Sequence, residues 1–196
     1  PWQGKTWRQL PWFFAETYFY RCLLEATRYF HGGPWKGHDP FGLAKRTALI
    51  ECLPELEAFV EALPAAATRE ERFACWFHRS LWGNRADLSN VAVSGTTFEA
   101  ASRQGVLIDH TAQVWRLLCG GSGRVDVVAD NAGPELLVDL GLIAFLIEEG
   151  LAQRVHLHLK AHPFFVSDAT VPDLQATLTA LQGSPRPTLR RLAARL

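Results

Sequence analysis

Apolar residues recur at helical spacing through the first half of the chain, with polar residues between them. From Trp12 to Phe30, polar residues at steps of four, four and three form one stripe, and aromatic residues cover the remaining faces. This spacing predicts a helix that is mostly buried. Further helices are expected from Asp39-Pro40 to about Leu53, and after Thr68, where Thr68-x-x-Glu71 has the form of a capping box.

The pattern changes after residue 105. A helix capped by Asp109 leads to a β-branched run, Arg124–Asp130, which predicts a short strand. Pro134–Leu151 is apolar on all sides, as in a buried helix, and Arg154–Lys160 predicts a second strand. A strand, a helix and a strand this close together predict a βαβ unit with parallel strands. A further helix is expected over Val171–Leu181.

The expected fold class is therefore α/β, with two parts. A helical N-terminal part spans residues 1–103, and an incomplete Rossmann-like α/β/α part with parallel strands spans 104–196.

Composition excludes several classes of protein. Charged residues make up 20% of the chain and hydrophobic residues 48%, as in an ordinary folded domain. Lys plus Arg and Asp plus Glu both number 20, so no charge surplus indicates a nucleic-acid or membrane partner. The four widely spaced cysteines, Cys22, Cys52, Cys75 and Cys119, are expected to be reduced core residues, which fits a cytoplasmic protein.

Candidate chemistry lies at the ends of the two predicted strands. Asp130 and Asn131 follow the first strand, and Asp168 lies in the loop after the second. The carboxyl ends of parallel strands share one edge of the sheet, so these oxygen donors are expected to meet there and to suit a hard divalent cation. Lys160 could neutralise a phosphate oxygen, and the helix after Gly133 adds free N–H groups at its N-terminus.

Simpler interpretations of these residues remain open. Asp130 could be a turn residue and Asp168 a helix cap. His156 and His158 share a strand face, with His162 nearby, but such histidines more often pack against a helix than bind a metal. Asn84, Arg85 and Asp87 follow Gly83, and they either form a solvated loop after a helix end or contact a ligand.

Four segments in order resemble the DUF89 family of damage-control phosphatases, and in particular its branch of acidic-residue (protein-glutamate) methyltransferase-like proteins. The segments are PWFFAETYFYRCLLEATRYF, SLWGNRADLS, RVDVVADNAGPEL and LKAHPFFVSDAT. The resemblance covers nearly the whole chain. It implies a divalent metal, Mn²⁺, Co²⁺ or Ni²⁺ with Mg²⁺ also possible, held by Asp130, Asn131 and Asp168. It also implies ligand contacts by Glu135 and by the loop that carries Asn84, Asp87 and Ser89.

The implied function is a metal-dependent phosphatase that hydrolyses small phosphorylated metabolites such as fructose 1-phosphate. Asp130 and Asp168 are the expected catalytic residues, and Glu135, Lys160, Asn84 and Asp87 the expected substrate contacts. Attack by water and an aspartyl-phosphate on Asp130 both remain open. Two alternatives are a carboxyl methyltransferase that uses S-adenosylmethionine and a non-catalytic, partner-binding fragment. The sequence does not indicate an oligomeric state.

The chain also departs from the family pattern. It contains no Met, and it ends before the K-G-D-x-N-Y-R and R-x-x-K motifs that the resemblance links to substrate binding. We therefore expect a piece of a longer protein, weak or inactive by itself.

Overall fold

Helix α5 (Pro134–Glu148) passes through the centre of the computed structural model, which describes residues 2–63, 67–83 and 106–196. Its residues from Glu135 to Leu146 are all buried, as the uniformly apolar sequence predicts. Gly133 precedes it with φ +77°, a left-handed conformation that glycine adopts without strain, and so allows the sharp turn from strand to helix.

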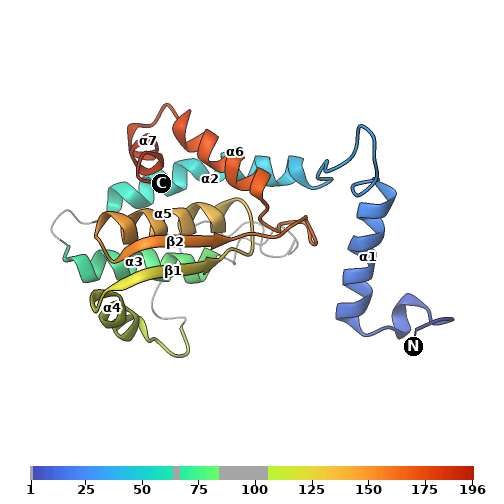
Figure 1. Ribbon diagram of the computed structural model, residues 1–196, viewed down its shortest axis with the longest axis horizontal. Coiled ribbons are helices and arrows are strands. Elements are labelled where there is room, and N and C mark those ends of the chain that lie inside the picture. The colour runs from blue at the N-terminus through green and yellow to red at the C-terminus, as the bar shows by residue number, and fades with distance from the viewer. Residues whose placement is uncertain (1, 64–66, 84–105) are drawn as a thin grey trace.

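The other elements surround α5 in chain order (Figure 1). They are the short 3-10 helix η1 (Trp7–Gln9), α1 (Trp12–Ala26), α2 (Gly42–Ala62), α3 (Arg69–Trp82), α4 (Thr111–Cys119), β1 (Ser122–Val128), β2 (Ala152–His158), α6 (Val171–Gln182) and α7 (Pro187–Ala193).

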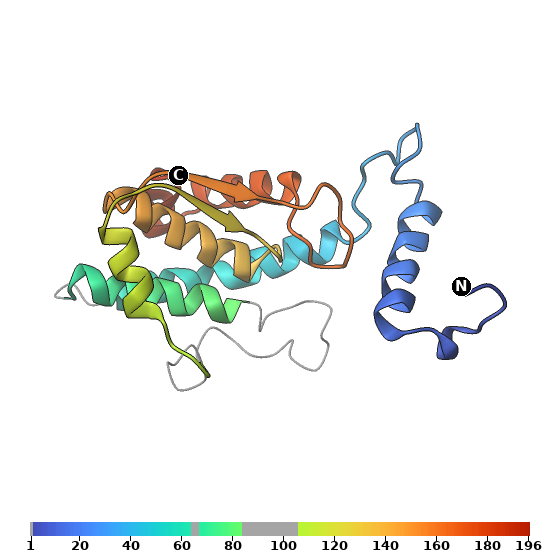
Figure 2. The ribbon, with the colours of Figure 1, turned by 60° about the horizontal axis from the view of Figure 1, so that its bottom comes forward.

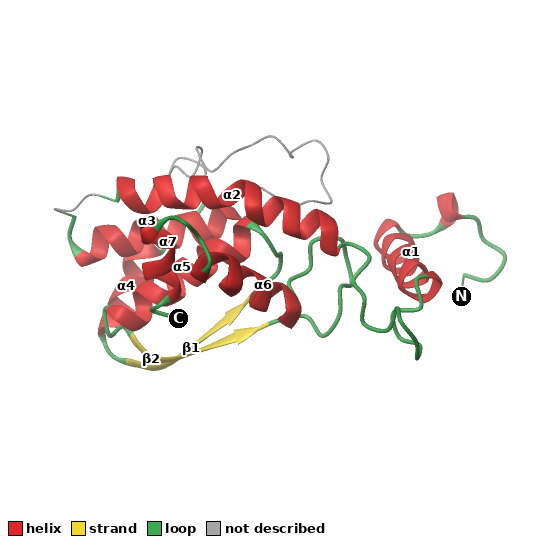
Figure 3. Ribbon diagram, turned by 90° about the horizontal axis from the view of Figure 1, so that it is seen from above, coloured by secondary structure: helices red, strands yellow, loops and turns green. Residues whose placement is uncertain are grey.

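Strand β1 precedes α5 in the chain and β2 follows it, and the two strands pair in parallel. This arrangement confirms the predicted βαβ unit. Val125 pairs with Val155 and Val127 with Leu157, and these four side chains pack into the core. In the described part of the chain the helices lie on one side of this small sheet (Figure 3). The architecture is thus a mixed α/β fold of partial Rossmann-like form, as expected.

The core is built on several faces of α5. Leu137, Val138 and Phe145 pack with residues of α2, α3 and α7, while Leu136 and Ile143 pack with the strands and α6. Gly141 allows a close approach, because a Cβ at this position would lie 2.1 Å from Cζ3 of Trp76. Helices on both sides of the predicted boundary at residues 103–104 therefore share one core. The boundary lies outside the described residues, and the two-part division stays a prediction.

Helix α1 is not the buried helix that the sequence predicts. Leu24 is its one buried residue, whereas Trp12 is 75% and Phe13 65% exposed. The helix stands to one side of the other elements (Figures 1 and 2), so most of its aromatic surface has no covering element within the described residues.

The described structure also corrects some element boundaries. Helix α2 begins at Gly42, two residues later than expected, because Asp39 accepts a hydrogen bond from the Phe41 N–H in a turn before the helix. Pro54 lies inside α2 and does not end it. A proline removes the hydrogen bond to the carbonyl four residues earlier, here Ile50, and Ile50 is 65% exposed, where water can bond that carbonyl. The capping box at Thr68 is confirmed.

All four cysteines are free and helical, as expected, but only Cys52 is buried. The prediction of a core position is therefore wrong for Cys22, Cys75 and Cys119. Each of these three lies on a helix face that the described residues leave open. None of the described helices is long and apolar enough to span a membrane.

Candidate active site

The ends of β1 and β2 bring four of the predicted site residues together. Asn131 and Asp168 form an antiparallel bridge, and the Ala169 N–H donates to the Asp130 carbonyl over 2.8 Å. Lys160 is joined to the same segment, because its N–H donates to the Ala169 carbonyl over 2.9 Å. The loop after β2 thus folds back onto the loop after β1.

Two carboxylates converge on one ammonium group at this point. Lys160 Nζ donates to Asp130 Oδ1 over 2.7 Å and to Asp168 Oδ1 over 3.0 Å. Partial burial lowers the pKa of Lys160, but the hydrogen bonds to Asp130 and Asp168 outweigh it, so the pKa is raised overall. Lys160 is therefore a cation at neutral pH. Its ammonium group lies where two carboxylates stabilise a positive charge.

The two carboxylates differ in their surroundings. Asp168 is 3% exposed, and its Oδ2 accepts hydrogen bonds from the Phe164 and Phe165 N–H groups at 2.8 and 2.9 Å. Asp130 is 56% exposed and accepts the Lys160 hydrogen bond. Asp168 is thus held by the protein, whereas Asp130 can be reached from solvent.

Hydrogen bonds on both sides orient the Asn131 amide. The Ser167 hydroxyl donates to Asn131 Oδ1 over 2.6 Å, and Asn131 Nδ2 donates to Glu135 Oε2 over 2.9 Å. A carbonyl oxygen has two lone pairs, so Oδ1 can accept from Ser167 and also coordinate a cation. Burial raises the pKa of Glu135, and the Asn131 hydrogen bond opposes that shift.

A buried lysine supports this arrangement from behind. Lys45, on α2, is 2% exposed, and its Nζ donates to the Asp168 carbonyl, Asp39 Oδ2 and Asp173 Oδ2, at 2.7, 2.7 and 3.0 Å. It thus ties α2 and the start of α6 to the backbone of Asp168. Sequence reasoning missed Lys45, since two of its three partners lie more than a hundred residues away.

The donor set fits a hard divalent cation. Asp130 and Asp168 each present an oxygen to one positively charged group, and Asn131 lies opposite Asp168 with its amide oriented. Oxygen-only sets of this kind are typical of Mg²⁺ or Mn²⁺ sites. Within the described residues, no three His, Cys, Asp or Glu side chains form such a group, so the set depends on the Asn131 amide.

The remaining predicted residues lie elsewhere in the fold or outside the described residues. Asn84, Asp87 and Ser89 lie outside the described residues, while Gly83 packs closely against Glu135, since a Cβ at Gly83 would lie 3.0 Å from Glu135 Cγ. None of the described helices covers His156 or His158, whose side chains are 41% and 55% exposed. They lie on the outer face of the sheet, where His158 Nε2 is 2.8 Å and His156 Nδ1 3.7 Å from Asp126 Oδ1.

Comparison with known proteins identifies relatives of this chain. Residues 3–196 match the family model of the damage-control phosphatase ARMT1-like domain. The damage-control phosphatase ARMT1 of Danio rerio is 33% identical over 199 residues, which cover 88% of this chain and 44% of that protein. The proteins of the same name from Mus musculus and Homo sapiens are 33% and 32% identical and are covered over 45% and 44% of their lengths. The chain thus spans about half the length of these relatives.

Proposed function

The chain belongs to the damage-control phosphatase ARMT1-like domain family, and from this premise we propose that it carries the metal-binding part of a divalent-metal-dependent phosphatase. The proposed substrates are small phosphate monoesters such as sugar phosphates of the fructose 1-phosphate type. The observation that supports the proposal most directly is the convergence of Asp130 and Asp168 on one cationic group.

In this proposal Asp130, Asn131 and Asp168 hold the ion, with Mn²⁺, Co²⁺, Ni²⁺ or Mg²⁺ as candidates. A bound divalent ion would orient the phosphate, offset its charge and lower the pKa of a bound water. Asp168 is suited to holding the metal ion, because two backbone N–H groups fix the position of its carboxylate. Asp130, the more exposed of the two, faces the incoming substrate.

Lys160 and the start of α5 supply positive charge for the phosphate. Lys160 lies beside both carboxylates, and its ammonium can turn from them to a phosphate oxygen. The N-terminus of α5 adds the positive end of the helix dipole, and its cap residue, Gly133, gives no side-chain hydrogen bond to the first turn. Glu135 contributes by orienting Asn131.

Titration calorimetry with Mn²⁺, combined with phosphate release from fructose 1-phosphate, tests the proposal. The expected result is Mn²⁺ binding that is lost in Asp130→Ala and in Asp168→Ala. Asp126→Ala is the matched control, because Asp126 is a carboxylate on the outer face of the sheet whose partners are His158 and Arg124. Binding that survives both site substitutions would sink the proposal.

Substitution of Lys160 separates its role from that of the carboxylates. Lys160→Met removes a cation that competes with the metal for the same oxygens, so Mn²⁺ affinity should be kept or increased. Phosphate release should fall by at least roughly tenfold, since the phosphate loses a charged hydrogen bond. Weaker Mn²⁺ binding in Lys160→Met would contradict this assignment.

The exposed aromatic surface of α1 favours a second candidate function, a non-catalytic role in binding a partner. Trp12, Phe13 and Tyr18 of α1, together with Trp7 of η1, are each more than half exposed, and such patches commonly mark interaction sites. This role requires no metal, so the same Mn²⁺ titration separates the two functions. If folded protein released or absorbed no heat on addition of Mn²⁺, the result would favour the partner-binding role.

A further inference from the structure

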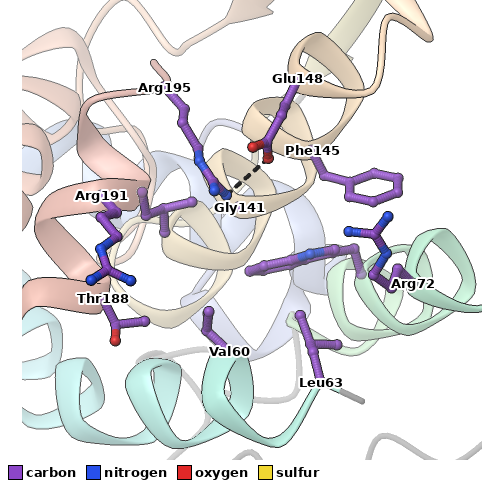
Figure 4. A pocket seen from close by; sticks show the side chains of 11 residues that line it. Val60, Leu63, Arg72, Gly141, Phe145, Glu148, Thr188, Arg191 and Arg195 are labelled. Carbon is purple, nitrogen blue, oxygen red and sulfur yellow. Dashed lines mark ion pairs between the residues drawn. The ribbon is translucent and has the colours of Figure 1, made fainter. Parts of the chain in front are cut away.

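A cavity lies beside the C-terminal half of α5 (Figure 4). The candidate active site lies at the other end of this helix, next to its N-terminus. The volume of the cavity is about 160 Å³, and α2, α3, α5 and α7 all contribute to its walls. An apolar cavity of about 150 Å³ accommodates a benzene molecule, so this one has room for a single aromatic ring.

The inner walls of the cavity are apolar. Trp76 lies against α5 at Gly141, where the missing side chain leaves room for the indole ring. Phe145 lines the same wall, and Val60 and Leu63 line the opposite one (Figure 4). These groups offer a ring contact surface, and the indole N–H of Trp76 is the one side-chain hydrogen-bond donor among them.

The lining also contains three arginines and one carboxylate. Arg195 pairs with Glu148 at 2.9 Å, and Arg72 pairs with Glu149 at 2.9 Å while its guanidinium lies 5.8 Å from the Phe145 ring centre. Arg191 forms no ion pair with any described residue. Arg72 Nε is buried and has no hydrogen-bond acceptor among the described residues. Positive charge at this cavity is thus only partly neutralised.

We propose that this cavity binds a small monocarboxylate that carries one aromatic ring. The ring fits the space between Trp76, Phe145 and Val60, and the carboxylate meets Arg191 at the rim. Arginine suits this role, because its planar guanidinium can bind both oxygens of a carboxylate at once. The site is separate from Asp130 and Asp168, and it does not depend on the phosphatase proposal.

Saturation-transfer NMR with phenylacetate as the probe tests this site in the full 196-residue chain. The expected result is saturation transfer to the phenylacetate ring and a dissociation constant that is roughly tenfold larger in Arg191→Glu. Arg154→Glu is the matched control, because Arg154 is an exposed arginine on β2 that does not line the cavity. It should leave the dissociation constant unchanged.

Two further comparisons test the ring and the charge separately. Acetate carries the charge without the ring, and benzyl alcohol carries the ring without the charge, so both should bind more weakly than phenylacetate. Val60→Phe, or Leu63→Phe if the first variant lowers the melting temperature, should fill the cavity and weaken phenylacetate binding. Equal affinity in Arg191→Glu and wild type, unchanged affinity in both filling variants, or no saturation transfer in the wild type would each overturn the proposal.

Discussion

At the residue scale, two buried acids on α5 differ from Asp126, the exposed acid on β1. Glu135 and Asp139 lie one helical turn apart, and burial raises the pKa of both. Asp139 accepts a hydrogen bond from the Ser80 hydroxyl over 2.6 Å, which links α5 to α3. On the outer face of the sheet, the hydrogen bonds from His158 and Arg124 lower the pKa of Asp126. The two environments therefore predict opposite pH dependences.

The stability of the wild-type fold should fall as pH rises, because the buried Asp139 then has to ionise. Asp139→Asn should remove this fall. An acid with a raised pKa in the folded state binds its proton more tightly there than in the unfolded chain, so stability falls above about pH 4, the ordinary aspartate pKa. The loss ends once the pH exceeds the folded-state pKa. Asparagine stays neutral and can still accept the Ser80 hydrogen bond. Urea unfolding between about pH 4 and pH 8 should show the variant gaining on the wild type as pH rises.

Asp126→Asn serves as the comparison with the opposite sign. The lowered pKa of Asp126 contributes stability above the ordinary aspartate pKa, and this contribution is lost as pH falls through the folded-state value. Asp126→Asn should therefore be less stable than the wild type at neutral pH, and this difference in stability should become smaller at acid pH. If the stability of Asp139→Asn and of Asp126→Asn, each relative to the wild type, changed in the same direction with pH, the opposite pKa shifts given to these two acids would be wrong.

At the element scale, Lys45 connects segments that are far apart in the sequence. It is buried near the start of α2 and bonds Asp39 before that helix, Asp173 in the first turn of α6, and the Asp168 carbonyl. The two carboxylates neutralise the ammonium, and three acceptors replace its water shell, which is the condition for burying a lysine.

Lys45→Met should destabilise the fold by about 3 kcal/mol, since it leaves two largely buried carboxylates without their cation. Lys36→Met is the matched control, because Lys36 is exposed, and a surface change of this kind usually stays within about 0.5 kcal/mol. Urea unfolding at neutral pH measures both. A loss in Lys45→Met no larger than in the control would show that the three bonds contribute little.

At the scale of the whole molecule, aromatic contacts connect α1 and the segment after it to the residues before α2 and to the loop after β2. The Tyr20 ring lies 5.9 Å from Phe41 and 5.3 Å from Phe165, and Phe30 lies 5.2 Å from His162. Phe165 also donates its N–H to Asp168. The position of α1 is thus linked to the loop that carries a candidate site residue.

Tyr20→Ala should release α1 while leaving the core intact. Amide hydrogen exchange in α1 should become faster, because the helix loses two of its ring contacts, whereas exchange in α5 should not change. Tyr18→Ala is the control, since Tyr18 contacts only Trp7 and Phe14 among the aromatic rings of the described residues. Equal exchange in wild type and Tyr20→Ala would mean that other contacts hold α1.

Local patterns in the sequence were enough to predict much of the fold. The apolar run of α5, the β-branched residues of β1 and β2, and the capping box at Thr68 each specify a conformation through neighbours a few residues away. The grouping of Asp130, Asn131 and Asp168 also followed, because parallel strands bring their carboxyl ends to one edge. Their roles in metal binding and catalysis stay predictions.

Other features could not be read from local pattern. The aromatic faces of α1 predict burial, but burial depends on which element covers a face, and α1 stands apart. Likewise, the alternation of residues along β2 places His156 and His158 on the same face of the sheet, but it does not say whether that face is covered or exposed. Covering partners come from distant parts of the chain, so periodicity alone does not identify them.

The sequence by itself determined the βαβ unit, its buried helix and the presence of two acids and an amide at the strand ends. Only the tertiary structure decided that Lys160 lies between Asp130 and Asp168, that Ser167 and Glu135 orient Asn131, and that Lys45 holds Asp168 from behind. The physical reason is range. Backbone conformation is governed by near neighbours in the chain, whereas the charge and hydrogen bonding of a site depend on groups that only the folded packing brings together.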